Sequence, residues 1–389
     1  AVIEGTPIFP HEPIVRVCGS LIDCQLLETA LLNCVNFETL IATKAARICE
    51  AAKGAPVAEF GLRRAQGLGG IWASRAAVVG GCASTSNVLA GKQFAIPVSG
   101  THAHSWVMAF ESEGEAFRAY AEYSANNCVL LVDTYNVIDG VKDAIEIGLA
   151  MQKKNQRLAA IRIDSGDLAW LSKQARTMLD EAGLVDCGIV LSNDLDECTI
   201  ESLLAQNAPA TAFGVGTKLA TAYDQPALGG VYKMSALYDE SSEKWQPKIK
   251  VTELASKITI PGVLNIRRFW DKEGFIVGDM VVDEANCAMQ AGISDESDVM
   301  VSSQDELKRK DMGGFESKYM LEPLARDGKS VLSKENTDAM CARARVKENM
   351  IHLDDSHKRF LNPHIYPVGL RLSLFELRRD LIARLRGIK

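Results

Sequence analysis

The sequence predicts an α/β fold in which a parallel sheet closes into a barrel, and three observations support this prediction. Between residues 56 and 238, apolar runs of strand length alternate with segments of helix length. Near-continuous apolar strands that alternate with helices are typical of a parallel sheet covered on both faces. Polar clusters directly follow several of these strands, as at the rim of a β/α barrel. An open, doubly wound sheet is the alternative fold.

The individual elements follow from the local patterns. Residues 1–20 predict short strands with Gly and Pro turns, and residues 21–50 predict one long helix, because apolar side chains recur there at helical spacing. Residues 251–282 predict β-hairpins, and residues 346–389 are helical in pattern. The predicted strands between are Val57–Phe60, Phe94–Val98, Cys128–Val132, Leu158–Ile163, Gly188–Leu191, Thr211–Val215 and Gly230–Met234. The predicted helices are Glu115–Ser124, Gly140–Gln152, Leu168–Glu181 and Glu197–Ala205.

Length and composition limit the class of protein. A chain of 389 residues exceeds what one hydrophobic core usually organises, which predicts at least two domains. The net charge of −7 argues against a nucleic-acid-binding protein, because phosphate neutralisation needs surplus Lys and Arg. None of the ten cysteines forms a C-x-x-C pair, and no apolar stretch has the length of a membrane span. We therefore expect a cytoplasmic protein with no zinc ribbon, no disulfide framework and no membrane contact.

Two of the six histidines lie in the segment Ser99–Ser105. An H-x-H pair can bind zinc in barrel hydrolases, but no further histidine follows before His352, so we reject a metal-dependent hydrolase. The small neighbours of His104 would let a substrate come close, and a neutral imidazole can attack phosphorus or move a proton. The alternative is a pair of structural histidines, one facing in and one facing out.

Arg162–Asp167 ends a predicted strand with a cation, two carboxylates and a hydroxyl. On a strand, Arg162 and Asp164 face the same side. An arginine at this place can bind a carboxylate or phosphate, and Asp164 can bind ribose hydroxyls or Mg²⁺ through water. The alternative is an internal ion pair, with Asp167 as the N-cap of the next helix.

Three further clusters follow predicted strands. Asn193 and Asp194 are candidate ligand contacts, whereas Asp196 is a candidate helix cap. Gly216 and Thr217 follow a late strand, where barrels bind phosphate at the start of a helix. Phe60, Arg63 and Arg64 end the first predicted barrel strand and offer a stacking surface and positive charge, although such an arginine pair is more often a surface feature.

Taken together, these clusters resemble the nicotinate phosphoribosyltransferase family. The resemblance extends over essentially the whole chain in matching order and spacing. It is carried by EFGLRRAQG at 59–67, SGTHAHS at 99–105, VDTY at 132–135, IRIDSGDL at 161–168, SNDLDE at 192–197, FGVGTKLATAYDQPALGGVYKM at 213–234, PGVLNIRR at 261–268 and LNPHIYP at 361–367.

The resemblance implies an irregular parallel β/α barrel at residues 55–238 and an α/β sandwich domain built from residues 1–54 and 239–389. It implies the formation of nicotinate mononucleotide and pyrophosphate from nicotinate and phosphoribosyl pyrophosphate, coupled to ATP hydrolysis, as a step of NAD salvage. Mg²⁺ is the implied cofactor, and a homodimer is the implied assembly.

The site residues are carried over by position. His104 matches the histidine that ATP phosphorylates, and His102 occupies a variable position without a catalytic role. We expect His104 and Asp164 to be catalytic. The residues expected to bind substrate are Phe60, Arg63, Thr101, Arg162, Ser165, Asn193, Asp194, Gly216 and Thr217.

One feature departs from the family pattern. Relatives carry an upstream T-D-x-Y-x-x-x-M-like run whose Tyr enters a neighbouring subunit's site, and we expect this segment to be missing here. This departure leaves open an inactive relative that only binds ligands. A second rival function, independent of this segment, is a nicotinamide phosphoribosyltransferase.

Overall fold

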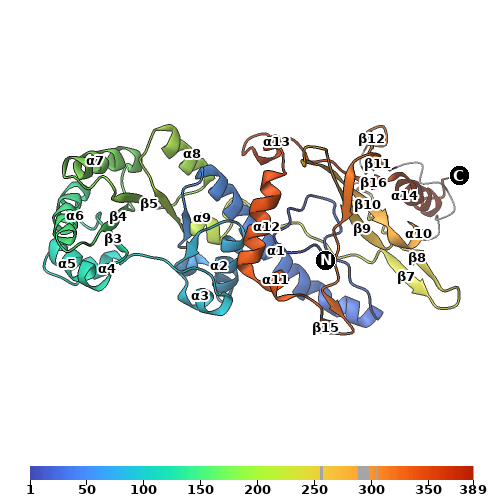
Figure 1. The fold of residues 1–389 in the computed structure, drawn as a ribbon. Coiled ribbons are helices and arrows are strands. Elements are labelled where there is room, and N and C mark those ends of the chain that lie inside the picture. Colours follow the sequence, from blue (N-terminus) through green and yellow to red (C-terminus); the bar gives the residue numbers. More distant parts are fainter. Residues whose placement is uncertain (255–256, 288–297, 304, 389) are drawn as a thin grey trace. The chain divides into compact units, whose positions relative to one another are not determined.

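The computed structural model describes residues 1–254, 257–287, 298–303 and 305–388, and the chain folds into two compact units (Figure 1). One unit comprises Cys34–Leu228, and the other combines Ala1–Asn33 with Gly229–Lys389. The predicted boundaries after residues 54 and 238 therefore differ from the divisions of the structure. The long helix α1 (Leu21–Ala51) explains the first difference, because only its later part belongs to the first of these units.

The unit of residues 34–228 is built on six parallel strands. They are β1 (Val57–Glu59), β2 (Ser84–Thr85), β3 (Cys128–Leu131), β4 (Leu158–Ile163), β5 (Gly188–Ser192) and β6 (Ala212–Val215). Their order is β2-β1-β6-β5-β4-β3, so that the first and last strands pair and the sheet curls back on itself. This order confirms the predicted irregular barrel, since an open doubly wound sheet would not pair β1 with β6.

Helices alternate with these strands and cover the sheet from outside (Figure 1). They are η1 (Leu62–Arg64), α2 (Gly69–Val79), α3 (Val88–Phe94), α4 (His104–Val107), α5 (Glu113–Tyr123), α6 (Val137–Gln152), α7 (Leu168–Glu181), α8 (Glu197–Ala205) and α9 (Thr217–Ala220). The predicted caps are confirmed: Asp167 accepts from the backbone N–H of Trp170 at 3.0 Å, and Asp196 from that of Thr199 at 2.7 Å.

The strands are buried on both faces, as their apolar sequences predict. Large side chains in this core are almost fully excluded from solvent, which favours folding by about 25 cal/mol for each Å² of apolar surface removed from water. Among them are Leu130, Leu131, Leu158, Ile161, Ile163 and Phe213. The core therefore holds the carboxyl ends of the strands in fixed positions.

Three predicted strands differ from the structure. Within Phe94–Val98, Phe94 ends α3, Ala95 adopts a left-handed conformation and only Val98 pairs, with Thr85. Gly230–Met234 forms no strand; its flanking glycines interrupt any ladder. Residues 1–20 contain only an isolated bridge, from Val2 to Leu321; within the segment, Val2 N–H donates to the carbonyl of Ile14, but no ladder of strand pairs forms.

The other unit contains a second six-stranded sheet of order β12-β11-β16-β10-β9-β13. Only β10 and β16 are parallel; the other pairs are antiparallel. Its strands are β9 (Leu264–Trp270), β10 (Ile276–Asp283), β11 (Val299–Ser302), β12 (Arg309–Asp311), β13 (Glu316–Tyr319) and β16 (Val368–Arg371). The hairpin β9–β10 confirms the later part of the predicted hairpin region; residues 255–256 of that region lie outside the described residues.

Helices and short hairpins complete this unit. The helix α14 (Leu372–Leu385) packs on β16 through Leu374, which gives the predicted sandwich of sheet and helix from the two ends of the chain. The remaining elements are β7 (Ala236–Asp239), β8 (Lys244–Pro247), α10 (Glu284–Cys287), β14 (Ala325–Arg326), β15 (Lys329–Ser330), α11 (Lys334–Thr337), α12 (Ala339–Ile351) and α13 (Asp355–Lys358). Among the described residues, no helix combines the length and the apolar character needed to cross a lipid bilayer.

Candidate active site at the carboxyl ends of the barrel strands

The candidate site lies at one rim of the barrel. All six strands run parallel, so their carboxyl ends meet at the same edge of the sheet. The segments after β1, β3, β4, β5 and β6 carry the polar clusters that the sequence places there. Hydrogen bonds between these segments bring residues far apart in the chain into one cluster.

Arg162 lies at the centre of this cluster. Its Nε donates to Ser192 Oγ at 2.8 Å, its Nη1 to Thr101 Oγ1 at 3.0 Å and its Nη2 to Asp164 Oδ1 at 2.8 Å. Ser192 also donates to Asp164. A guanidinium group has five N–H donors, so these three bonds orient it and leave two donors for a ligand.

The ring of Phe60 lies against the Arg162 guanidinium, with 5.0 Å between its centroid and the arginine Cζ. Gly214 of β6 makes this position possible, because a Cβ atom there would lie 2.5 Å from the Phe60 ring. An aromatic face and an arginine thus stand side by side at the rim. This pair suits a flat ring that carries a negative charge.

His104 begins α4 and is flanked by two carboxylates. Its Nδ1 lies 3.2 Å from Thr134 Oγ1. Its Nε2 lies 3.9 Å from both Asp133 Oδ1 and Asp164 Oδ2, which is an electrostatic contact rather than a hydrogen bond. The side chain is 42% exposed, so the imidazole is accessible to a substrate from outside.

Asp133 is a site residue that sequence reasoning did not select. Its side chain is fully buried, and its Oδ2 accepts from the backbone N–H of Asp164 at 2.9 Å and from Ser165 Oγ at 2.6 Å. Its buried Oδ1 has no hydrogen-bond partner within the described part of the chain and faces His104. The signal was present, since Asp133 follows the strand Cys128–Leu131 as Asp164 follows the next strand.

His102, the neighbouring histidine, has a different environment. It is buried between Phe117 and Tyr120, and its Nε2 accepts a hydrogen bond from the backbone N–H of Leu131 at 3.2 Å. Burial lowers the pKa of His102, which favours the neutral ring. Its contacts are those of a structural residue.

The loop after β5 is strained and exposed. Asn193 and Asp194 adopt φ angles of 99° and 38°, in the left-handed region that non-glycine residues rarely adopt. Both side chains are exposed at the rim. Asp196 anchors the end of this loop through Lys218, with 2.6 Å between Oδ2 and Nζ. Against the effect of burial, Lys218 and Thr199 lower the pKa of Asp196 to about 2.

Gly216 and Thr217 lie at the start of α9, a single helical turn. No side chain caps this turn in the part of the chain that the structure describes, so its first backbone N–H groups stay available. A Cβ atom at Gly216 would come within 3.3 Å of the carbonyl oxygen of Phe60, which shows how closely the two loops approach. The turn is joined to the preceding loop through the Lys218–Asp196 ion pair.

Arg63, another predicted site residue, does not take part in this network of contacts. It is exposed on η1, and no hydrogen bond or ion pair of Arg63 with the cluster is present among residues 1–254. The turn before it is fixed by the buried Glu59, which accepts from the backbone of Gly61, from Ser74 Oγ at 3.0 Å and from Thr85 Oγ1 at 2.6 Å. Glu59 thus fixes the backbone turn that carries Phe60.

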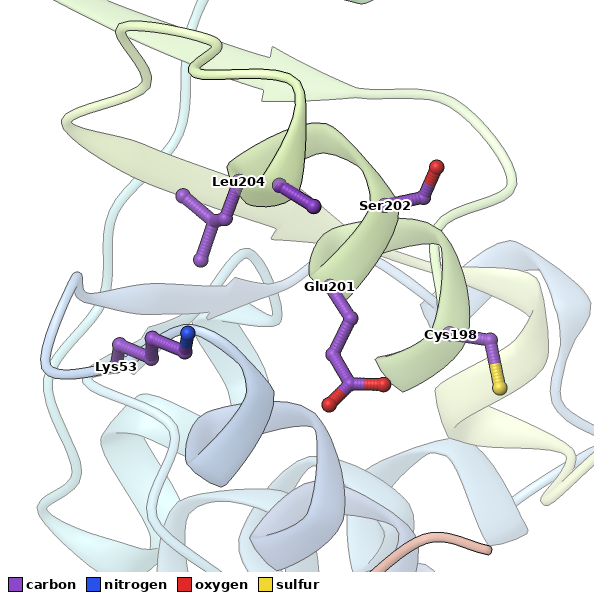
Figure 2. A pocket seen from close by; sticks show the side chains of 6 residues that line it. Lys53, Cys198, Glu201, Ser202 and Leu204 are labelled. Atoms are coloured by element: carbon purple, nitrogen blue, oxygen red, sulfur yellow. The ribbon is translucent and has the colours of Figure 1, made fainter.

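A cavity of about 430 Å³ lies elsewhere, between the end of α1 and α8 (Figure 2). Lys53, Cys198, Glu201, Ser202 and Leu204 line it together with Ala205. None of the rim residues contributes to it. It lacks convergent polar groups of the kind found around Arg162, so we do not assign the chemistry to it.

No cluster of three or more His, Cys, Asp or Glu side chains suited to a metal ion exists among the described residues. Mg²⁺ does not need such a cluster, because it commonly keeps water ligands and is bound by one or two carboxylates together with substrate phosphates. Asp164 is half-buried at the rim, and Asp133 has an unpartnered oxygen beside it. These oxygens fit a magnesium ion that a phosphorylated substrate brings with it.

A hydroxyl-rich, arginine-centred rim on a parallel barrel defines an α/β enzyme that acts on a small anionic substrate. The model of the nicotinate phosphoribosyltransferase family matches residues 56–260, and that of the nicotinate phosphoribosyltransferase C-terminal domain matches residues 265–378. Together these matches cover most of the chain. The chain belongs to the nicotinate phosphoribosyltransferase family.

Individual relatives agree with this assignment. The chain is 42% identical over 376 residues to the nicotinate phosphoribosyltransferase of Bacillus subtilis, covering 94% of this chain and 74% of the relative. It is 34% identical over 442 residues to that of Caenorhabditis elegans, covering 97% and 75%. The crystal structure of human nicotinic acid phosphoribosyltransferase is similar with a TM-score of 0.80 and 27% identity, covering 98% of this chain and 81% of that one.

Proposed function

We propose that this chain is a nicotinate phosphoribosyltransferase that joins nicotinate to phosphoribosyl pyrophosphate, releases pyrophosphate and couples the reaction to ATP hydrolysis. The observation that carries the proposal is the Arg162 cluster. It places an oriented guanidinium over an aromatic ring and beside an accessible histidine. The product, nicotinate mononucleotide, would enter NAD salvage.

The acid-binding half of the site follows from the geometry of Arg162. Its two remaining N–H donors can bind a carboxylate, and Thr101 supports the same face of the guanidinium. Phe60 offers a surface on which a pyridine ring can stack. A positive group at this place favours nicotinate over nicotinamide, because an amide carries no charge to pair with the arginine.

The sugar-phosphate half of the site follows from the loops after β4, β5 and β6. The free backbone N–H groups at Gly216 and Thr217 suit the 5′-phosphate. Asp164, Asn193 and Asp194 lie at the same rim and suit the ribose hydroxyls and pyrophosphate. Magnesium, when bound to the phosphates near Asp164 and Asp133, would supply positive charge for the departing pyrophosphate.

The reaction needs positioning more than covalent help. The pyridine nitrogen attacks C1 of the ribose, the bond from C1 to the pyrophosphate oxygen breaks, and its electron pair leaves with pyrophosphate. Arg162 and Phe60 would hold the pyridine ring in line for this attack. Asp164, beside the ribose, would stabilise the positive charge that develops on C1 and the ring oxygen.

His104 would supply the coupling to ATP. A hydrogen bond donated by Nδ1 to Thr134 Oγ1 would leave the lone pair on Nε2 to attack the γ-phosphorus of ATP, while the bond from that phosphorus to the β–γ bridging oxygen breaks and ADP leaves. The phosphohistidine would add negative charge next to Asp133 and Asp164. Repulsion by the phosphohistidine would change the affinity of the site for pyrophosphate. Hydrolysis of the phosphohistidine would shift the overall equilibrium toward the product.

The deciding experiment incubates the purified protein with nicotinate, phosphoribosyl pyrophosphate and Mg²⁺, with and without ATP, and follows nucleotide and protein by mass spectrometry. We expect nicotinate mononucleotide, a faster reaction with ATP, and a phosphoryl group on His104. Nicotinate binding without product would instead identify a ligand-binding relative. Faster turnover of nicotinamide would assign the amide as the substrate.

The variant His104→Asn tests the coupling. Asparagine keeps a polar side chain but has no nucleophilic nitrogen, so ATP should no longer raise the rate, while slow ATP-independent product formation remains. Labelling with γ-³²P-ATP should then leave the protein unlabelled. ATP stimulation that persists in this variant would contradict the role of His104. Light scattering and cell fractionation would test the proposed homodimer and cytoplasmic location.

A further inference from the structure

A hydroxyl group that the proposed reaction does not use lies between two charged residues of the rim. Ser192 is the last residue of β5, and only 1% of its surface is exposed. Its Oγ accepts a hydrogen bond from Nε of Arg162 at 2.8 Å and donates one to Oδ1 of Asp164. A serine hydroxyl has a single donor. Because Asp164 takes this donor, the hydroxyl serves the protein itself rather than a substrate.

The neighbouring strands place this hydroxyl. In the register of the sheet, Ser192 lies opposite Gly214 of β6. A Cβ atom at Gly214 would lie 3.2 Å from Ser192 Cβ and 2.5 Å from the Phe60 ring, so the glycine leaves room for both side chains. On its other side, β5 pairs with β4, the strand that carries Arg162. The position of Ser192 beside the guanidinium group therefore follows from the sheet.

The contacts of Ser192 complete a closed ring of hydrogen bonds. Arg162 Nη2 donates to the same Oδ1 of Asp164 at 2.8 Å. Ser192 Oγ and Asp164 Oδ1 together thus occupy Nε and Nη2, two donors that one carboxylate can bind with both of its oxygens. Asp164 pairs with Arg162 through one oxygen only. Its other oxygen, Oδ2, accepts no hydrogen bond from the described residues and lies 3.9 Å from Nε2 of His104.

The second sheet contains an arginine and an aspartate without such a hydroxyl between them. Arg268 and Asp279 lie opposite each other on β9 and β10. There Nε donates to Oδ1 and Nη2 donates to Oδ2, so that both carboxylate oxygens bond to the guanidinium group. A two-point ion pair of this kind pairs the charges of both residues with each other. At the rim, it would compete with the substrate for both groups.

We propose that Ser192 is a positioning residue that keeps Arg162 and Asp164 from closing into a two-point ion pair. Its neutral oxygen satisfies the Nε donor without a second contact to the negative charge, and its O–H group holds Asp164 at Oδ1. Arg162 then keeps its charge for the carboxylate of nicotinate, and Asp164 keeps Oδ2 for the ribose. The inference rests on the proposed function of Arg162 and Asp164.

The first test is the crystal structure of Ser192→Ala, which requires no turnover. Alanine removes the hydroxyl group and leaves the Nε donor of Arg162 without its acceptor, which is costly for a buried donor. We expect the Asp164 carboxylate to rotate until both of its oxygens bond to Nε and Nη2, as in the Arg268 pair. Oδ2 should then move away from His104. An Asp164 side chain that keeps its wild-type position would overturn the proposal.

The second test is a double-mutant cycle on the KM for nicotinate. Ser192→Ala should raise this KM about tenfold, because the closed pair competes with the substrate carboxylate for Arg162. Asp164→Asn removes the charge that drives the pair to close and should itself lower kcat. Addition of Ser192→Ala to Asp164→Asn should then change the KM by less than about twofold.

This cycle separates positioning from a merely structural role. A structural loss would raise the KM by the same factor whether residue 164 is charged or neutral, and that result would overturn the proposal. A KM for nicotinate that Ser192→Ala leaves unchanged would also overturn it. Should Ser192→Ala fail to fold, Ser192→Cys takes its place in both tests, with the same expected results, because a thiol keeps the side-chain shape but bonds weakly.

Ser172→Ala is the matched control. Ser172 is also buried, and its hydroxyl donates to the carbonyl oxygen of Ala169 within α7 at 3.1 Å. This substitution removes the same group from the same unit without a change in the rim cluster. Its KM for nicotinate should stay within about twofold of the wild-type value. An increase equal to that of Ser192→Ala would overturn the proposal, since loss of any buried hydroxyl would then have this effect.

The two proposals can fail separately. A wild-type protein that forms no nicotinate mononucleotide contradicts the proposed function, whatever the position of Asp164 in the variant. The crystal structure of Ser192→Ala still decides whether Ser192 prevents the two-point pair.

Discussion

The two units of this protein each contain an arginine held by carboxylates, and the two clusters differ in what they leave open. In the sheet of residues 264–371, Arg268 is 1% exposed and pairs with Asp279 through Nε at 2.9 Å and Nη2 at 2.6 Å. Nη2 also donates to the carbonyl of Pro7, and Tyr366 donates to Asp279. At the barrel rim, Arg162 is 16% exposed and divides its bonds among two hydroxyls and one carboxylate.

This difference shows that the same residue types can be fully enclosed in one place and left accessible in another. The Arg268 cluster joins the segment around Pro7 to the second sheet and faces no solvent. A buried ion pair adds little net stability, but loss of one partner leaves an uncompensated charge. Arg162 is oriented by neighbours that do not enclose it, so its remaining donors can bind a ligand.

The largest expected effect comes from opening the rim cluster. Arg162→Ala should lower kcat/KM for nicotinate by about a thousandfold, because the substrate carboxylate and the orientation of the ring lose their partner. The unfolding midpoint should change little, since Ser192 and Asp164 remain hydrogen-bonded to each other. Steady-state kinetics and urea unfolding measure the two effects. A large loss of stability with activity retained would show that Arg162, like Arg268, holds the fold together and does not bind the substrate.

The matching substitution in the other unit should have the opposite pattern. Arg268→Ala should lower the free energy of unfolding by about 3–5 kcal/mol, because Asp279 stays buried without its cation. Turnover per folded molecule should be unchanged. Replacing both partners, as in Arg268→Met with Asp279→Leu, should recover part of the loss. Urea unfolding of the single and double variants checks this coupling.

The smallest expected effect concerns two glutamates with buried carboxyl oxygens, Glu113 and Glu12. Burial and the neighbouring acidic groups raise the pKa of Glu113 from 4.5 to about 7, so the destabilisation of the folded state by its charge is absent below pH 4.5, grows between pH 4.5 and 7 and stays constant above pH 7. Relative to wild type, Glu113→Gln should therefore gain about 1–2 kcal/mol of stability between pH 5 and 8. For Glu12, burial and Asp279 raise the pKa to about 10, so the gain from Glu12→Gln should likewise begin above pH 4.5 but continue to grow up to about pH 10. Urea unfolding over this pH range measures both.

The barrel and the place of its site could be predicted from the sequence because local patterns carry them. Apolar runs mark β3, β4 and β5, and the polar residues after a parallel strand must gather at one edge. The predicted caps Asp167 and Asp196 depend only on residues three positions further along the chain.

What could not be predicted depends on contacts between distant segments. Asp133 looks like an ordinary residue after a strand until Asp164 and Ser165 are seen to bond to it. Glu113 looks like a solvent-exposed helix start, and only Gly140, 27 positions away, shows the space for its carboxyl group. The run Gly230–Met234 has the hydrophobicity of a strand but no partner strand within the described structure.

The incomplete closure of the barrel has a consequence for the histidine segment. β2 pairs through Thr85 with Val98, while the outer edge of β3 meets no strand among the described residues; its amide at Leu131 is satisfied by the His102 ring instead. The stretch from Ser99 to His104 therefore crosses a seam in the wall where a side chain replaces a ladder of backbone bonds. His104 therefore follows directly on the part of the wall that a side-chain contact completes, rather than on a strand paired on both sides.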